Sequence, residues 1–337
     1  MIDVLVAGGG PAGLAAAIHA ARTGLEAVVV EPRPAPVDKA CGEGIMPSGV
    51  VALRSLGIDV QGHELRGIRY VDGVRDARAL FRGGKGLGVR RTALHTALHA
   101  RALALGVRVV QGKVTGVRQE GDRVTACGLT ARWLIAADGL HSPLRRALGL
   151  DRPAEEPGRY GLRRHYRVAP WSDFVEVHWS RRGEAYVTPV GDALVGVAVL
   201  SRERCPYDEH LTDFPGLAAS LRGWEAGPVR GAGPLRQRCR EPRAGRVLLV
   251  GDAAGYVDAL TGEGVALALA TAGAAIGCVA AGRPEDYPAG WARLTRRHRL
   301  LTGALLRAAR NPGASRLIVP LAGRLPRVFG AAVHALQ

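Results

Sequence analysis

The sequence predicts an α/β fold, in which a mostly parallel sheet in a three-layer arrangement is interleaved with a second, antiparallel sheet. Three observations predict it. The apolar run at residues 2–7 turns through glycines into a helical segment. Apolar runs typical of buried strands recur at residues 133–137 and 246–250, so the core sheet is resumed late in the chain. Between them, residues 160–200 alternate in polarity as half-buried antiparallel strands do.

The first turn has the spacing of a dinucleotide-binding loop. Gly8, Gly10 and Gly13 follow the first apolar run as Gly-x-Gly-x-x-Gly, and Glu31 ends the next apolar run. The first glycine permits a tight turn, the second lets backbone approach a pyrophosphate, and the third allows close packing of helix on strand. The helix N-terminus would face the phosphates, and Glu31 would bind ribose hydroxyls. This combination predicts a dinucleotide-binding βαβ unit.

The remaining elements are predicted from periodicity and turn residues. We expect a Pro- and Gly-rich loop over 32–47, helices at 48–56, 91–105 and 263–280, strands within 65–81 and at 107–110, and a hairpin-like stretch over 113–127. The 337 residues, 47% of them hydrophobic, suffice for two interleaved domains. The expected division is a nucleotide-binding domain of residues 1–64, 86–155 and 241–290, a substrate-binding β-sheet domain of 65–85 and 156–240, and a C-terminal helical segment of 291–337.

Several classes of protein are excluded by composition. No apolar run reaches 18 residues, and no charged leader precedes the first strand, so neither a membrane span nor a signal peptide is expected and the predicted location is the cytoplasm. The five cysteines are scattered without metal-ligand spacing, which predicts reduced thiols and no metal site.

The net charge of +16 comes from arginines spread along the chain, because only three of the 46 basic residues are lysines. No basic patch interleaves with aromatic residues, so a nucleic-acid partner is not expected. After Asp286 the arginines alternate with leucines in a pattern typical of basic amphipathic helices. Such helices either contact an anionic membrane surface or pack on the substrate domain, and packing is the favoured interpretation.

Three separated segments together resemble one family. They are the Gly8 to Gly13 loop with Glu31, the segment Ala-Asp-Gly-Leu-His-Ser-Pro-Leu-Arg at 137–145, and Val-Gly-Asp-Ala-Ala-Gly at 250–255. Their order and spacing resemble the FAD signatures of single-component flavoprotein monooxygenases and geranylgeranyl reductases. The resemblance implies a Rossmann-like FAD-binding domain, noncovalent FAD, and NADPH or NADH as a transient reductant that binds without its own Rossmann domain.

The resemblance also implies site residues. Asp252 is expected to accept from a ribityl hydroxyl, Asp138 to act as a support, and Arg91 to contact the FAD phosphates, with Arg90 as the alternative. The full set of expected cofactor contacts is Gly8, Gly10, Pro11, Ala12, Gly13, Glu31, Pro32, Arg33, Cys41, Gly42, Arg91, Asp138, Gly251, Asp252, Gly262, Glu263 and Gly264.

Two loops are expected at the flavin ring. Cys41-Gly42-Glu43-Gly44 resembles a segment of geranylgeranyl reductases that passes over the flavin edge, and Cys41 and Glu43 are the predicted catalytic residues because either could deliver a proton. The alternative is a packed cysteine and a loop charge. Residues 258–264 precede a helix whose positive end would stabilise negative charge on the reduced ring, unless Thr-Gly-Glu is only a helix cap.

The sequence is less specific about which residues bind the substrate. Polar and aromatic side chains on the alternating strands are candidates to face a pocket, although alternation does not reveal which face is covered: Arg163, Arg164, His165, Tyr166, His178, Trp179 and Tyr186. The leading expectation is an NAD(P)H-using monooxygenase that hydroxylates a hydrophobic aromatic or polyketide-like molecule with O2. The runner-up delivers hydride to a prenyl carbon–carbon double bond. Halogenation ranks lower because Trp-x-Trp-x-Ile is absent, and a noncatalytic FAD-binding protein is the alternative from another class.

Overall fold

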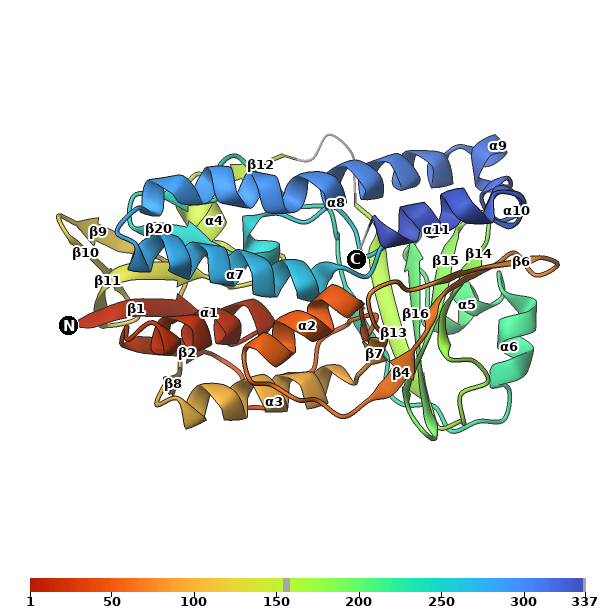
Figure 1. Cartoon of the computed structure of the whole chain (residues 1–337), viewed down its shortest axis with the longest axis horizontal. Helices are drawn as coiled ribbons and strands as arrows, with labels where there is room; N and C mark the ends of the chain where they lie inside the picture. Colours follow the sequence, from red (N-terminus) through yellow and green to blue (C-terminus); the bar gives the residue numbers. More distant parts are fainter. Residues whose placement is uncertain (154–157, 336–337) are drawn as a thin grey trace.

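The computed structural model describes residues 1–153 and 158–335. Five parallel strands form the centre of an eight-stranded sheet in the order β20-β11-β1-β2-β8 (Figure 1). Their bounds are β1 (Ile2–Ala7), β2 (Ala27–Glu31), β8 (Arg108–Gln111), β11 (Leu129–Ala136) and β20 (Val247–Leu249). Antiparallel strands extend it, namely β9 (Arg118–Glu120), β10 (Arg123–Ala126) and β19 (Arg243–Ala244).

Four helices cover one face of this sheet: α1 (Pro11–Arg22), α2 (Pro47–Ser55), α3 (Arg91–Ala104) and α7 (Gly264–Ala280). Both α1 and α7 are rich in alanine and glycine, so the two helices pack closely side by side. The other face is covered by the β9–β10 hairpin and α4 (Pro143–Ala147). The three-layer, mostly parallel arrangement predicted from the sequence is therefore confirmed.

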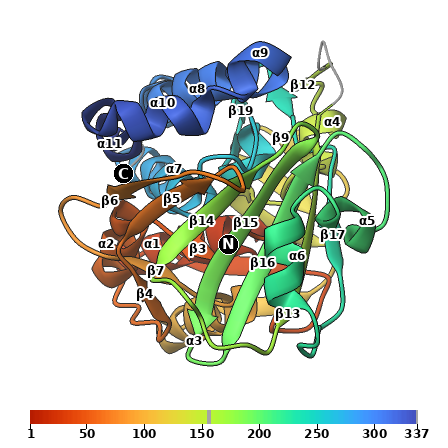
Figure 2. The same ribbon diagram turned by 90° about the vertical axis from the view of Figure 1, so that its right-hand side faces the viewer.

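The second sheet has seven strands in the order β17-β13-β16-β15-β14-β5-β6 (Figure 2). They are β5 (Gly67–Val71), β6 (Asp76–Leu80), β13 (Tyr160–Tyr166), β14 (Phe174–Trp179), β15 (Gly183–Gly191), β16 (Leu194–Ser201) and β17 (Arg230–Ala232). One pair departs from the predicted antiparallel pattern, because β5 and β14 run parallel. These strands are joined by a long stretch of chain instead of a hairpin, so their direction is not fixed by a turn.

Short elements connect the two sheets and cover the second one. Strands β3 (Gly44–Ile45), β4 (His63–Leu65) and β7 (Gly86–Gly88) form a small sheet, and β12 (Asp151–Arg152) pairs with β18 (Arg238–Cys239). Helices α5 (Tyr207–Leu211) and α6 (Pro215–Leu221) pack on one face of the seven-stranded sheet. The strands of residues 67–80 thus join those of 160–232, but the division into domains remains a proposal.

The chain ends in helices that lie across both parts of the molecule (Figures 1 and 2). They are α8 (Tyr287–Arg310), α9 (Pro312–Ser315), α10 (Ile318–Arg324) and α11 (Pro326–His334), preceded by the 3-10 turns η1 (Gly251–Ala254) and η2 (Pro284–Asp286). Helix α8 packs on α7, while α10 and α11 pack on β6. Among the described residues, none of the helices has the length and apolar character needed to cross a bilayer. All five cysteines are free thiols, as the sequence predicted.

Candidate functional site

A large cleft extends from the glycine loop after β1 to the second sheet, and its empty volume, counted to the open mouth, is about 2210 Å³. Loop residues after β1 and β2 line one end. Side chains of β5, β14, β15 and β16 line the other end, which is largely apolar. The cleft therefore joins a predicted phosphate-binding loop to a hydrophobic compartment.

The glycine loop is shaped by close backbone contacts. Gly8 has φ of 105°, and a Cβ there would lie 2.4 Å from the Ala137 carbonyl oxygen. A Cβ on Gly13 would lie 1.8 Å from the Gly8 carbonyl oxygen, so only glycine lets α1 approach β1 this closely. Gly8, Gly10, Pro11 and Ala12 line the cleft, whereas Gly13 lies behind the loop and supports it through packing.

Glu31 closes this loop from the end of β2. Its Oε2 accepts the Gly9 N–H at 2.8 Å, and its Oε1 accepts from Arg33 Nε at 2.7 Å. Burial acts to raise the pKa of Glu31, but the hydrogen bonds from Arg33 and Gly9 outweigh it and lower the pKa. The carboxylate therefore stays ionised and can accept from hydroxyl groups. Pro32 and Arg33 line the cleft beside it.

His95 on α3 is a supporting residue that the sequence analysis missed. Its Nε2 lies 3.0 Å from the Gly9 carbonyl oxygen, and since a carbonyl only accepts, Nε2 carries the hydrogen. Burial, reinforced by Arg91, lowers the pKa of His95 to about 4, so the ring is neutral. The available signal was its position four residues after Arg91, on the buried face of the same helix.

Because His95 is neutral in the fold and titrates at a higher pH when unfolded, protonation favours the unfolded chain. Stability is fully present above the unfolded pKa of about 6.5 and is lost as pH falls from there toward 4. His95→Gln keeps a hydrogen-bond donor but does not titrate. Between pH 7 and 4 we therefore expect its free energy of unfolding to fall by on the order of 2 kcal/mol less than that of the wild type. Urea unfolding between pH 7 and 4 measures it, with His99→Gln as the control. Identical pH profiles for wild type and His95→Gln would contradict this role.

Arg91 begins α3 and reaches the cleft beside Gly10. Its guanidinium is buried, and Nη1 has no hydrogen-bond partner among the described residues. Burial lowers the pKa of Arg91, which shows that its charge is poorly compensated. A buried unpaired cation next to a helix N-terminus fits an anionic diphosphate. Arg90, the alternative considered from the sequence, does not line the cleft.

The second and third signature segments are joined by Arg145, a residue quoted in the signature but not chosen as a site residue. Its side chain is fully buried, and its guanidinium donates to Asp151, to the Leu140 and Ala253 carbonyl oxygens, and to Gln237 at 2.7–3.1 Å. Arg145 therefore fixes the loop after β11 against the turn after β20.

The two aspartates of these segments lie differently. Asp138 and Asp252 both line the cleft, but only Asp138 accepts a hydrogen bond from α4 among the described residues, from the Leu144 N–H to Oδ2 at 3.0 Å. Burial raises the pKa of both carboxyl groups. Gly251 does not line the cleft. Its φ is 57°, and a Cβ there would lie 2.8 Å from Ala12 Cβ, so it serves the turn after β20.

We expect Arg145→Met to lower the free energy of unfolding by about 3 kcal/mol, because it leaves the acceptors of a buried guanidinium without their donor. Chemical denaturation of the apoprotein measures this loss. The exposed neighbour Arg146→Met is the matched control and should be near neutral. Equal stability of the two variants would show that Arg145 does not tie the segments together.

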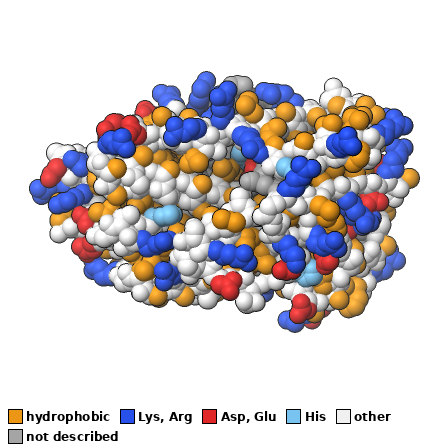
Figure 3. All heavy atoms as spheres, viewed as in Figure 1, with side chains coloured by type: hydrophobic (Ala, Val, Ile, Leu, Met, Phe, Trp, Pro, Cys, Tyr) orange, Lys and Arg blue, Asp and Glu red, His pale blue; other side chains and the backbone are white. Residues whose placement is uncertain are grey.

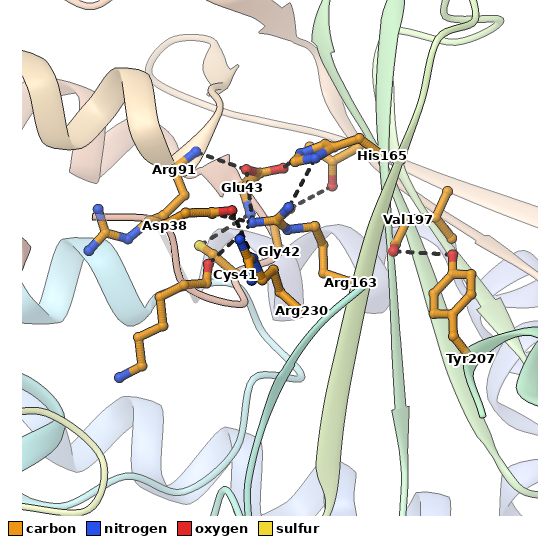
Figure 4. Close-up of polar contacts among 12 residues, drawn as sticks. Asp38, Cys41, Gly42, Glu43, Arg91, Arg163, His165, Val197, Tyr207 and Arg230 are labelled. Atoms are coloured by element: carbon orange, nitrogen blue, oxygen red, sulfur yellow. Dashed lines mark hydrogen bonds and ion pairs between the residues drawn. The ribbon is translucent and has the colours of Figure 1, made fainter. Parts of the chain in front are cut away.

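The loop at 38–44 is held against β13 by a buried polar network (Figure 4). Glu43 Oε1 accepts the Arg91 N–H at 2.8 Å, and Oε2 lies 2.6 Å from His165 Nε2. Arg163 Nη1 lies 2.9 Å from His165 Nδ1 and Nη2 donates to Asp38 at 2.6 Å. Since an arginine only donates, His165 Nδ1 accepts and Nε2–H donates to Glu43. Glu43 thus connects the first backbone N–H of α3, that of Arg91, to the second sheet.

Cys41, Gly42 and Glu43 all line the cleft. Glu43 has φ of 59°, a strained conformation for a non-glycine residue that its buried contacts hold in place. The Glu43 N–H lies 3.4 Å from Cys41 Sγ, and Thr188 donates to the Gly42 carbonyl oxygen at 2.9 Å. Burial, with a contribution from Glu43, raises the pKa of Cys41. The thiol is therefore protonated at neutral pH.

The loop at 258–264 is positioned by Asp258, whose carboxylate accepts from Arg159 at 2.6 and 3.0 Å, while Arg159 also pairs with Glu184 of β15. Thr261, Gly262 and Gly264 line the cleft at the start of α7. Glu263 differs from the prediction, because its carboxylate pairs with His298 of α8 and its side chain is absent from the cleft wall.

The hydrophobic compartment is formed by alternate residues of the second sheet, among them Val175, Val177 and Leu200. Tyr186 lines it and donates its hydroxyl to the Leu260 carbonyl oxygen at 2.9 Å. Of the other predicted strand residues, Arg163 lines the cleft and His165 lies behind Glu43. The rest are engaged elsewhere: Arg164 with Asp208, Tyr166 in the core beneath α5 and α6, His178 with Glu176, and Trp179 with Tyr70.

A glycine loop at a helix N-terminus, an acid at the end of β2 and a buried arginine facing the same cleft define the class of dinucleotide-binding proteins. The chain belongs to the family of FAD binding domains, which matches residues 1–180. It is an FAD-dependent oxidoreductase, and NAD(P)H is the reductant typical of this family.

Two relatives are similar over most of their length. The chain is 31% identical over 339 aligned positions to the menaquinone reductase of Mycolicibacterium smegmatis, covering 88% of this chain and 80% of the relative. It is 32% identical over 298 positions to digeranylgeranylglycerophospholipid reductase 1 of Methanopyrus kandleri, covering 79% and 77%. The solved p-nitrophenol 4-monooxygenase of Pseudomonas putida superposes with a TM-score of 0.82 at 18% identity, over 100% of this chain and 98% of that one, which shows a shared fold.

Proposed function

We propose that the chain uses FAD to reduce a carbon–carbon double bond in a long hydrophobic molecule of prenyl type. The observation that carries this proposal is a protonated thiol, Cys41, in the wall of a cleft whose far end is apolar. The names of the two relatives described above support it, because both are reductases. Hydroxylation, the leading expectation from the sequence, is supported by likeness of fold.

The residues present fit FAD. Arg91 supplies an unpaired buried cation for the diphosphate, Glu31 an ionised acceptor for ribose hydroxyls, and Asp252 a carboxyl group in the cleft. Bound and reduced by NAD(P)H, the cofactor would supply a hydride. The protein's own part is to exclude water, to hold the substrate against the apolar wall, and to deliver a proton.

In this proposal Cys41 Sγ gives its proton to one carbon of the double bond while hydride adds to the other, so the product gains two hydrogens. Glu43 is a positioning residue, because both of its carboxylate oxygens already accept hydrogen bonds and its backbone N–H contacts Cys41 Sγ. A thiol with a raised pKa is a suitable proton donor at neutral pH, since it remains protonated.

The test is a single-turnover experiment on the holoprotein. The flavin is reduced anaerobically and mixed with a polyprenyl quinone or a prenylated lipid. Flavin absorbance is followed, and the product mass is measured after any quinol has been oxidised back to the quinone, so that only a saturated carbon–carbon bond keeps the two added hydrogens. Anaerobic reoxidation with a product that gains two hydrogens is expected. Reoxidation that requires O2 and adds one oxygen atom to the substrate would establish the hydroxylase instead. No substrate-dependent reoxidation under either condition would overturn the proposal that prenyl compounds are the substrates.

A further inference from the structure

The C-terminal helices bury one set of apolar residues and expose another. Val319, Ala322, Phe329 and Val333 are buried against the second sheet. Four other apolar residues of this segment, Leu317, Leu321, Leu325 and Val328, are 46–62% exposed. Single exposed leucines are common on protein surfaces, but Leu317 and Leu321 lie one turn apart along α10, and Leu325 and Val328 follow where α10 ends and α11 begins. The four residues form an exposed apolar strip on this segment. Packing on the protein therefore accounts for only one side of these helices.

Arginines flank this strip. Arg316, Arg324 and Arg327 are exposed, and in the described parts of the chain none of the three forms an ion pair. Nine arginines and no acidic residue follow Asp286 in the sequence. Figure 3 shows basic and hydrophobic side chains next to each other along the edge formed by α8 to α10. This surface thus combines exposed apolar area with uncompensated positive charge.

We propose that this surface, the basic apolar strip of Leu317, Leu321, Leu325 and Val328 with Arg316, Arg324 and Arg327, docks on a bilayer containing anionic lipids. Leucines enter the headgroup region while flanking arginines pair with lipid phosphates, which is the pattern of interfacial amphipathic helices. A nucleic acid would engage the arginines but leave the leucines exposed. A bilayer uses both.

The docking surface lies beside the hydrophobic end of the cleft. Val333 of α11 lines that end, and the ring of Phe329 lies 4.6 Å, centroid to centroid, from Tyr70, which lines it too. Docking would therefore place the hydrophobic compartment near the bilayer, from which a lipid-soluble molecule could enter. This last step rests on the proposed function, whereas the docking does not.

Flotation of the FAD-loaded protein with vesicles, in the absence of substrate, tests the docking. We expect binding to equal parts of phosphatidylcholine and phosphatidylglycerol, much weaker binding to phosphatidylcholine alone, and release by salt. Reversing the charge of the three arginines together (R316E, R324E, R327E) should weaken partitioning into the anionic vesicles at least about a hundred-fold. Each basic residue near such a surface contributes about 1 kcal/mol of binding free energy, and about 1.4 kcal/mol corresponds to a tenfold change. Leu321→Ser with Val328→Ser should weaken it on both lipid mixtures.

The matched control reverses three exposed arginines on other elements (R54E, R181E, R222E), with the same change in net charge. It should bind vesicles nearly as the wild type does, and all variants should retain FAD and its reduction by NAD(P)H. Equal loss in the control would show a net-charge effect and overturn the proposal. Binding to DNA or heparin without binding to vesicles would overturn it as well, as would strip variants that change only the oligomeric state.

Discussion

Arg91→Met is expected to weaken FAD binding by about two orders of magnitude while leaving the apoprotein at least as stable as the wild type. The reason is the state of this side chain, which is buried with Nη1 unpartnered among the described residues and whose pKa is lowered by burial. A buried cation without a partner costs free energy in the apoprotein, and removing one partner of a buried charge pair costs about 2–5 kcal/mol of affinity. Methionine keeps most of the volume and removes the charge.

Fluorescence titration of the apoprotein with FAD, together with urea unfolding, separates the two effects. Arg90→Met is the matched control, because Arg90 precedes the same helix without lining the cleft. It should bind FAD nearly as the wild type does. A large loss of stability in the Arg91→Met apoprotein, with unchanged affinity for FAD, would mean that the arginine serves the fold and not the cofactor.

The glycine loop shows which parts of the site a sequence can predict. Gly8, Gly13 and Glu31 lie within one βαβ unit, so their spacing alone determines where they meet. The buried polar network at the loop of residues 38–44 depends instead on contacts between distant parts of the sequence. Glu43 and His165 are 122 residues apart, and they meet because the seven-stranded sheet lies against the loop after β2. Local patterns predicted both residues as candidates, but only the fold could pair them.

Glu263 and Arg145 show that the positions of single side chains are difficult to predict from the sequence. Glu263 stands between two residues that line the cleft, yet its side chain points to His298 of α8, a partner that the sequence places 35 residues away without any pattern linking them. An arginine in the first turn of a helix is usually exposed to solvent, but Arg145 in α4 is fully buried. The direction of a side chain beside a helix N-terminus depends on what packs there, and periodicity does not contain that information.

Cys41→Ser is expected to retain FAD but to slow the substrate-dependent reoxidation of reduced flavin by at least about ten-fold, because general acids typically contribute about a hundred-fold or more. The substitution changes little volume, and among the described residues the thiol forms no hydrogen bond to a predicted phosphate or ribose contact. Stopped-flow absorbance measures the rate. Glu43→Gln removes the charge but keeps one acceptor for the Arg91 N–H or for His165, so it should retain FAD and slow the reaction less.

The pH dependence distinguishes a proton donor from a packed thiol. Burial and Glu43 raise the pKa of Cys41, so the wild-type rate should stay constant through neutral pH and fall only above the usual range of a cysteine, as the donor loses its proton. This falling limb should be absent in Cys41→Ser, because serine does not titrate there. In Glu43→Gln the limb should move to lower pH, since the carboxylate that disfavours the thiolate is gone. If Cys41→Ser and Glu43→Gln both react at the wild-type rate, with the wild-type profile, the loop at 38–44 is scaffolding, and the proton comes from elsewhere in the cleft.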